Sequence, residues 1–192
     1  MTDEREQVVL VSPFDDDVGV GSKLEVHRTG DLHRAFSVFV FDDDGRMLLQ
    51  RRARTKYHSG GLWSNTSCGH PRPGEPTIHA AARRLHEEMG ITSELSPSFS
   101  FIYRAMVSHD LIEHELDHVF IGHTSDQPTH NPAEVDEWRW VNAAEVREWV
   151  TTEPEAFTAW FGLAFKGLMR EADKTLDILL YSYILQLGRT AQ

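Results

Sequence analysis

The sequence predicts an α/β fold in which a mixed β-sheet lies between layers of helices. Two observations carry this prediction. Five segments have the apolar, β-branched and aromatic character of strands, and polar or glycine- and proline-containing stretches separate them. Helical patterns occur between these strands and again after the last one, so helices can pack on a sheet from more than one side.

The first predicted elements are a hairpin and a helix. The segments RAFSVFVF (34–41) and MLLQRR (47–52) flank the turn DDDG (42–45), which is typical of two antiparallel strands. Glycines and prolines then mark a loop that ends at Pro76. A helix is expected next, with Thr77 as N-cap and Gly90 as stop. Its apolar residues have helical spacing: Ile78, Ala81, Ala82, Leu85 and Met89.

Three further strands and a helical end complete the prediction. The strands are FSFIYRAMV from Phe99, LIEHELDHVFIG from Leu111 and VDEWRWV from Val135, and the chain is predicted to be helical from Ala143 onward. The 192 residues contain no internal repeat and no low-complexity linker. We therefore expect a single domain over residues 1–192, with a core at about 30–150 and a helical part at 151–192.

Composition narrows the classes of function and location. The formal net charge of −11 argues against a nucleic-acid surface, because phosphate backbones bind basic faces. A single cysteine predicts a reducing compartment, and the polar start MTDEREQ lacks the pattern of a secretory signal, so a cytoplasmic location is expected. The apolar runs FTAWFGLAF and ILLYSYILQL are shorter than the roughly 20 residues of a membrane helix, so no membrane span is expected.

The segment HELDH (114–118) matches the H-E-x-x-H pattern of zinc proteases. That pattern requires a helix, whereas the flanking residues LI and VFIG favour a strand. On a strand, Glu113, Glu115 and Asp117 face one way, and His114 and His118 face the other. The first two carboxylates, about 7 Å apart, could then share a metal site. The alternative is a solvated, charged strand face.

A longer motif begins at Gly69. It reads G-x5-E-x7-RRLHEEMGI and includes Glu75 and the pair Glu87 and Glu88. It resembles the Nudix box, G-x5-E-x7-R-E-U-x-E-E-x-G-U, at every defined position except Arg84, which replaces a glutamate. The resemblance implies a Nudix-type α/β/α sandwich in which a loop and a helix hold divalent cations against a diphosphate. An arginine at this position would bind a diphosphate and disfavours its hydrolysis.

A narrower resemblance covers roughly residues 23–160. Cys68-Gly69-His70, LLQRRA (48–53), two early histidines and Glu113-His114-Glu115 resemble the type I isopentenyl-diphosphate isomerases. That family moves a double bond in a small homoallylic or allylic diphosphate and leaves the diphosphate intact. The resemblance implies a metal-dependent isomerase. Two alternatives stay open, namely a Nudix diphosphohydrolase and a diphosphate sensor without catalytic activity.

The resemblance also implies which residues bind metal and substrate. One Mg²⁺ or Mn²⁺ would be bound by three imidazoles and two carboxylates, a set that suits six-coordinate geometry. A second Mg²⁺ would bridge from Glu88 to the diphosphate, and four cationic side chains would neutralise that group. The residues of the first metal site are His27, His33, His70, Glu113 and Glu115, and the cationic residues are Lys23, Arg52, Lys56 and Arg84.

Moving the double bond requires two acid/base groups on opposite faces of the substrate. The resemblance assigns these roles to Cys68 and Glu115, with Tyr103 assisting Glu115. It assigns Trp160 to face the carbocation, since an aromatic ring attracts a desolvated positive charge. From the sequence alone, Cys68 could instead be a small buried hydrophobe and Trp160 a core tryptophan. Oligomeric state is not predicted.

Overall fold

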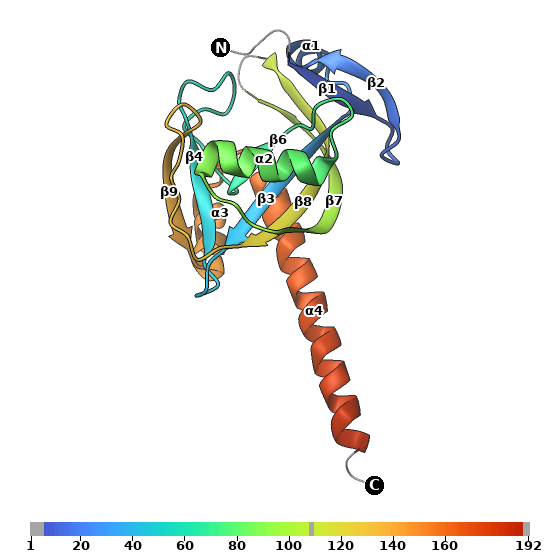
Figure 1. Cartoon of the computed structure of the whole chain (residues 1–192), viewed down its shortest axis with the longest axis vertical. Coiled ribbons are helices and arrows are strands. Elements are labelled where there is room, and N and C mark those ends of the chain that lie inside the picture. Colours follow the sequence, from blue (N-terminus) through green and yellow to red (C-terminus); the bar gives the residue numbers. More distant parts are fainter. Residues whose placement is uncertain (1–5, 108–109, 190–192) are drawn as a thin grey trace.

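The protein is built on a mixed β-sheet with helices on both of its faces (Figure 1). The computed structural model describes residues 6–107 and 110–189, with side chains described up to Thr175. The strands within these residues are β1 (Gln7–Val11), β2 (Asp17–Ser22), β3 (His33–Phe41), β4 (Met47–Arg52), β5 (Trp63–Ser64), β6 (Ser67–Gly69), β7 (Leu95–Met106), β8 (Ile112–His123) and β9 (Val135–Val141). The helices are α1 (Lys23–Thr29), α2 (Thr77–Met89), α3 (Ala143–Thr152), a short 3₁₀ helix (Pro154–Ala156) and α4 (Phe161–Arg189).

Strand β3 organises the sheet. It runs parallel to β8, in a register that pairs His33 with Glu115. It is antiparallel to β4, β1 and β6, and the β6 pairing sets Ser37 opposite Cys68. Strand β7 extends the sheet beyond β8, and β9 extends it beyond β4, both antiparallel. The parallel pair within an otherwise antiparallel sheet makes it mixed.

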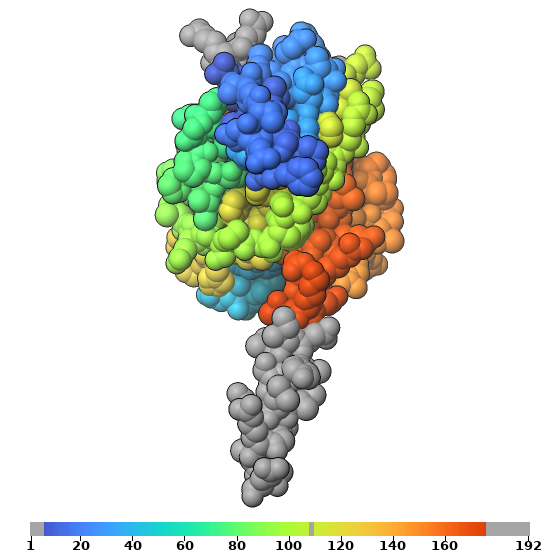
Figure 2. Space-filling model, turned by 90° about the vertical axis from the view of Figure 1, so that its right-hand side faces the viewer, coloured from blue at the N-terminus to red at the C-terminus, as the bar shows by residue number. Residues whose placement is uncertain are grey.

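Alternate residues of β3 enter two separate cores. Val38 and Val40 pack with Leu85 of α2 on one face. Phe39 packs with Val146 of α3 and with the start of α4 on the other. Neighbouring strand residues point to opposite faces, so one apolar run supplies both layers. Figure 2 shows the first turns of α4, in orange-red, lying against the body of the molecule next to the orange α3. The predicted α/β fold with a mixed sheet is confirmed.

Most elements expected from the sequence are present. The hairpin is formed by β3 and β4, the three later strands are β7, β8 and β9, and the chain from Ala143 is helical apart from short connections. The prediction that HELDH lies on a strand is also confirmed, since it lies within β8. The N-cap prediction is wrong: Pro76 precedes the helix, which starts at Thr77, and the Pro76 carbonyl accepts the first backbone hydrogen bonds. Elements β1, β2 and α1 were not predicted, and the predicted loop that ends at Pro76 contains the short strands β5 and β6.

Helix α4 runs away from the sheet toward the C-terminus (Figure 1). Among the described residues, none of the helices combines the length and the apolar character that crossing a membrane requires. The apolar run ILLYSYILQL (178–187) lies outside the described side chains, so the expectation for that run stays a prediction.

Candidate active site

A cavity of about 670 Å³ opens between α2, the loop after β4 and the paired strands β3, β6 and β8. It gathers nine of the residues singled out in the sequence, from segments far apart along the chain. These residues are Lys23, Arg52, Lys56, Cys68, His70, Arg84, Glu113, Glu115 and Trp160. Of the others, His27, His33 and Tyr103 are buried among the carboxylates and imidazoles, and Glu88 is buried next to Arg84.

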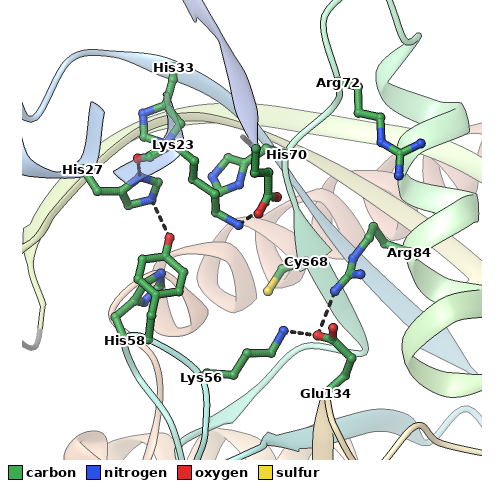
Figure 3. Close-up of polar contacts among 12 residues, drawn as sticks. Lys23, His27, His33, Lys56, His58, Cys68, His70, Arg72, Arg84 and Glu134 are labelled. Carbon is green, nitrogen blue, oxygen red and sulfur yellow. Dashed lines mark hydrogen bonds and ion pairs between the residues drawn. The ribbon is translucent and has the colours of Figure 1, made fainter. Parts of the chain in front are cut away.

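Three imidazoles converge where α1, β3 and β6 meet (Figure 3). The ring of His33 lies 4.8 Å from that of His27 and 5.0 Å from that of His70. The Nδ1–H of His27 donates to the carbonyl of Lys23 (2.7 Å), and that of His33 donates to the carbonyl of Asp31 (2.9 Å). These bonds fix the tautomer, so each Nε2 offers a lone pair to the centre of the cluster.

The charge states of these histidines suit a metal ion. Burial lowers the pKa of His27 to about 4 and that of His70 to about 3, so both rings are neutral at neutral pH. The Nε2 of His33 has no hydrogen-bond partner among the described residues and lies 3.5 Å from a carboxylate oxygen of Glu115. A lone pair beside a carboxylate is favourable only if a cation lies between them. The donor set therefore fits a divalent ion.

Glu113 and Glu115 lie on the buried face of β8, two residues apart, as predicted for a strand. The hydroxyl of Tyr103 on β7 lies 2.7 Å from Glu115 and 3.2 Å from Glu113. Burial and then the charge of Glu115 raise the pKa of Glu113 well above its usual range. Burial opposes ionisation of Glu115, but Glu113 and the nearby imidazoles of His33 and His70 hold its pKa well below that range. Two carboxylates this close favour one proton shared by the pair.

Two residues of the loop after β4 join this cluster and were missed in the sequence. The Tyr57 hydroxyl donates to the free Nε2 of His27 (3.3 Å), and the Nε2 of His58 lies 3.0 Å from Glu113. Burial lowers the pKa of His58 to about 2. The only sequence feature that could have pointed to His58 is its position two residues after Lys56. Potential ligand atoms lie within 4.8 Å of one another in two groups: His27, His33, His70 and Glu115, and His27, His58 and Glu113.

Cys68 lies on β6, and its thiol contacts the guanidinium of Arg52. Burial raises the pKa of its thiol to about 12, so the sulfur is protonated at neutral pH. An N–H of the Arg52 guanidinium donates to Sγ at 3.4 Å, and the same guanidinium lies 5.4 Å from the ring of Trp160. The Trp160 indole in turn donates to Asn65 (3.1 Å), which fixes the ring in the cavity wall. The contact of Arg52 with sulfur was not anticipated.

The remaining cations of the cavity come from α1, the loop after β4 and α2, and each is paired with a carboxylate (Figure 3). Lys23 lies 3.0 Å from Glu6, and Lys56 forms an ion pair with Glu134. Arg84 contacts three carboxylates, those of Glu88 (2.5 Å), Glu87 (2.8 Å) and Glu134 (2.9 Å). Glu88 also accepts a hydrogen bond from Gln50 (2.8 Å). The positive charges of Lys23, Lys56 and Arg84 are therefore balanced by glutamate carboxylates of the same chain.

Comparisons with known proteins agree with this geometry. The model of the NUDIX domain matches residues 31–161. An isopentenyl-diphosphate Delta-isomerase 2 from Aromatoleum aromaticum is 52% identical over 155 residues, covering 81% of this chain and 82% of that protein. An isopentenyl-diphosphate Delta-isomerase from Serratia proteamaculans is 50% identical over 163 residues, covering 85% and 91%.

Solved structures share the fold at low sequence identity. A Deinococcus radiodurans protein designated DR0079 superposes with a TM-score of 0.70 at 18% identity, covering 85% of this chain and 98% of that one. A MutT protein from Methanosarcina mazei gives a TM-score of 0.62 at 21% identity, covering 73% and 95%. At these identities the likeness extends to the fold alone.

Proposed function

The chain belongs to the Nudix superfamily and, within it, to the isopentenyl-diphosphate Delta-isomerases, and from this premise we propose how its side chains carry out the reaction. The enzyme interconverts isopentenyl diphosphate and dimethylallyl diphosphate. One observation supports our assignment above all: Cys68 and Glu115 line the same cavity, together with an indole ring and several cations.

Glu115 and Cys68 exchange protons with the substrate from its two sides. In the forward direction Glu115 gives a proton to the terminal carbon of the alkene, and the alkene electron pair forms the new C–H bond. The adjacent tertiary carbon becomes a cation. Loss of a proton from carbon-2 to the Cys68 sulfur then forms the new double bond. Afterwards Cys68 is a thiol and Glu115 a carboxylate, and these are the charge states described above for the empty cavity.

The surroundings protect the cationic intermediate. Trp160 offers a ring face to a positive charge, and a desolvated cation gains on the order of 2 kcal/mol there. Trp160 and Tyr103 are both more than nine-tenths buried, so the wall next to the cation is formed by ordered side chains instead of water, which would trap the cation as an alcohol. Tyr103 keeps Glu115 oriented by hydrogen bonding to it.

We assign the metal ligands from the same geometry. A Mg²⁺ or Mn²⁺ ion would be held by His27, His33, His70, Glu113 and Glu115, and a second Mg²⁺ by Glu88 next to the diphosphate. When bound, the first ion would withdraw electron density from Glu115 and strengthen it as an acid. Lys23, Lys56 and Arg84 would neutralise the diphosphate, and Arg52 would lie between that group and the reacting carbons. A cytoplasmic location is part of the same proposal.

The proposal can be tested by incubating the enzyme with labelled isopentenyl diphosphate and Mg²⁺ in deuterated water, with and without a chelator. We expect dimethylallyl diphosphate that contains deuterium, and loss of turnover when the chelator is present. Release of phosphate from nucleoside diphosphate derivatives without allylic product would instead favour a hydrolase. Tight substrate binding without either product would favour a sensor.

The contact between His58 and Glu113 leads to a prediction about metal affinity. Replacing His58 with phenylalanine keeps a ring but removes the nitrogen that contacts the Glu113 carboxylate, so we expect metal binding to weaken about tenfold to a hundredfold. His58→Gln keeps an N–H donor and is expected to retain most of the affinity. Both values can be measured by competition with a chromogenic chelator. Equal affinities for the phenylalanine variant and the wild type would contradict this role.

A further inference from the structure

Glu134 meets two cations in the cavity and has no role so far. It lies in the loop before β9, and its side chain lines the cavity. A single oxygen of its carboxylate, Oε2, contacts both the ammonium group of Lys56 and the guanidinium of Arg84 (2.9 Å) (Figure 3). These two cations come from separate elements, the loop after β4 and α2. Only the fold brings them to one oxygen.

The backbone around Glu134 is fixed on both sides. The amide of Ala53 donates to the carbonyl of Glu134 (2.9 Å), and the amide of Glu134 donates to the carbonyl of Asn131 (2.9 Å). The amide of Asn131 donates to the carbonyl of Glu88 at the end of α2 (2.8 Å). The loop is therefore tied to the elements that carry Lys56 and Arg84. Only the Glu134 side chain needs to rotate for the carboxylate to leave its position.

The carboxylate is charged when the cavity is empty. Burial alone would raise the pKa of Glu134, but the charge and hydrogen bond of Lys56, followed by those of Arg84, hold it below its usual value. One anionic oxygen between an ammonium and a guanidinium is also the arrangement that a phosphate oxygen adopts in protein sites. In the proposed function, Lys56 and Arg84 bind the diphosphate.

We propose that the Glu134 carboxylate occupies the position of a substrate phosphate oxygen in the empty cavity and must be displaced before the diphosphate binds. This inference rests on the proposed function, because it takes Lys56 and Arg84 as diphosphate ligands. An anion that binds here must then overcome the free-energy cost of displacing the Glu134 carboxylate. An anion with several charges gains more from the two cations than it loses by displacing one carboxylate, whereas a weakly charged anion does not. The displacement cost lowers the affinity of every anion that uses these two cations.

Removal of the Glu134 charge should strengthen anion binding, an effect that few substitutions produce. Glu134→Gln removes the competing charge and keeps the size of the side chain, so we expect it to bind inorganic pyrophosphate about tenfold more tightly than the wild type. Binding of inorganic phosphate should tighten by a similar factor, because both anions displace the same carboxylate. Isothermal titration calorimetry of the purified full chain measures both. Glu134→Ala serves as a second variant if the amide forms hydrogen bonds of its own.

Glu137→Gln is the matched control. Glu137 lies three residues further on, forms ion pairs with Arg51 and Arg139, and does not line the cavity. Its substitution should leave pyrophosphate affinity within about twofold of the wild type. Unchanged or weaker pyrophosphate binding in both Glu134 variants, with their thermal unfolding cooperative, would overturn the inference.

Two more variants separate this inference from the proposed function. Lys56→Met and Arg84→Gln should each weaken pyrophosphate binding if these cations hold the diphosphate. If neither does so, the assignment of the diphosphate site fails, and the inference fails with it. If both weaken binding while the Glu134 variants leave it unchanged, the diphosphate site stands and only the inference about Glu134 is wrong.

Discussion

Replacement of Cys68 by alanine is expected to lower kcat by about a thousandfold or more, since general acid/base groups contribute about 10²–10⁴ to a rate. The substrate would lose the group that exchanges the proton at carbon-2. Lys56 and Arg84, which bind the diphosphate in our proposal, are retained in this variant, so KM should change little. Steady-state kinetics with isopentenyl diphosphate gives both constants, and a KM-only effect would contradict a catalytic Cys68.

Ser67→Ala provides a control on the same strand. Ser67 is buried next to Cys68 on β6, but alternation along the strand turns its side chain away from the cavity, which it does not line. We expect this variant to keep kcat within about twofold of the wild type, because the Ser67 hydroxyl lies outside the cavity and has no hydrogen-bond partner among the described residues. A residual kcat within about tenfold of the wild type for Cys68→Ala would count against the proton transfer proposed for the thiol.

The substitution Glu115→Gln is expected to abolish turnover at any metal concentration. An amide has no proton to give to an alkene, and the loss should again be about a thousandfold or more. The matched variant is Glu113→Gln, which lies on the same face of β8 and contacts the same Tyr103 hydroxyl. It should weaken the metal site but leave the carboxyl group of Glu115 in place to exchange a proton with the substrate. Turnover of this variant should therefore recover substantially when metal is added in excess.

Measuring kcat and bound metal together separates the two roles. Metal content can be followed by atomic emission, and turnover by the formation of labelled allylic product. If saturating metal restores Glu115→Gln as well as Glu113→Gln, then Glu115 acts only as a ligand and the acid must be another residue. If neither variant loses metal, the ligand assignment on β8 is wrong.

Local patterns in the sequence were sufficient for most of the fold. The alternation along β3 and the helical spacing of Leu85 and Met89 each depend on residues that are close together in the chain. The same alternation put Glu113 and Glu115 on one face of β8, and the structure has both of them buried. The three elements before β3 were missed, because the hydrophobic residues of β1, β2 and the short helix α1 show no strong periodicity.

The sequence by itself determined the layered α/β architecture and the family. Strand alternation, helix spacing and the Nudix box that begins at Gly69 all depend on residues that are close together in the chain. Only the tertiary structure decided the contacts of Tyr57, His58 and Glu134. Lys56 and Glu134 are 78 residues apart, and His58 reaches Glu113 only because the loop after β4 folds over β8. Such contacts depend on the register of strands and the path of loops, and neither is encoded in the spacing of neighbouring residues.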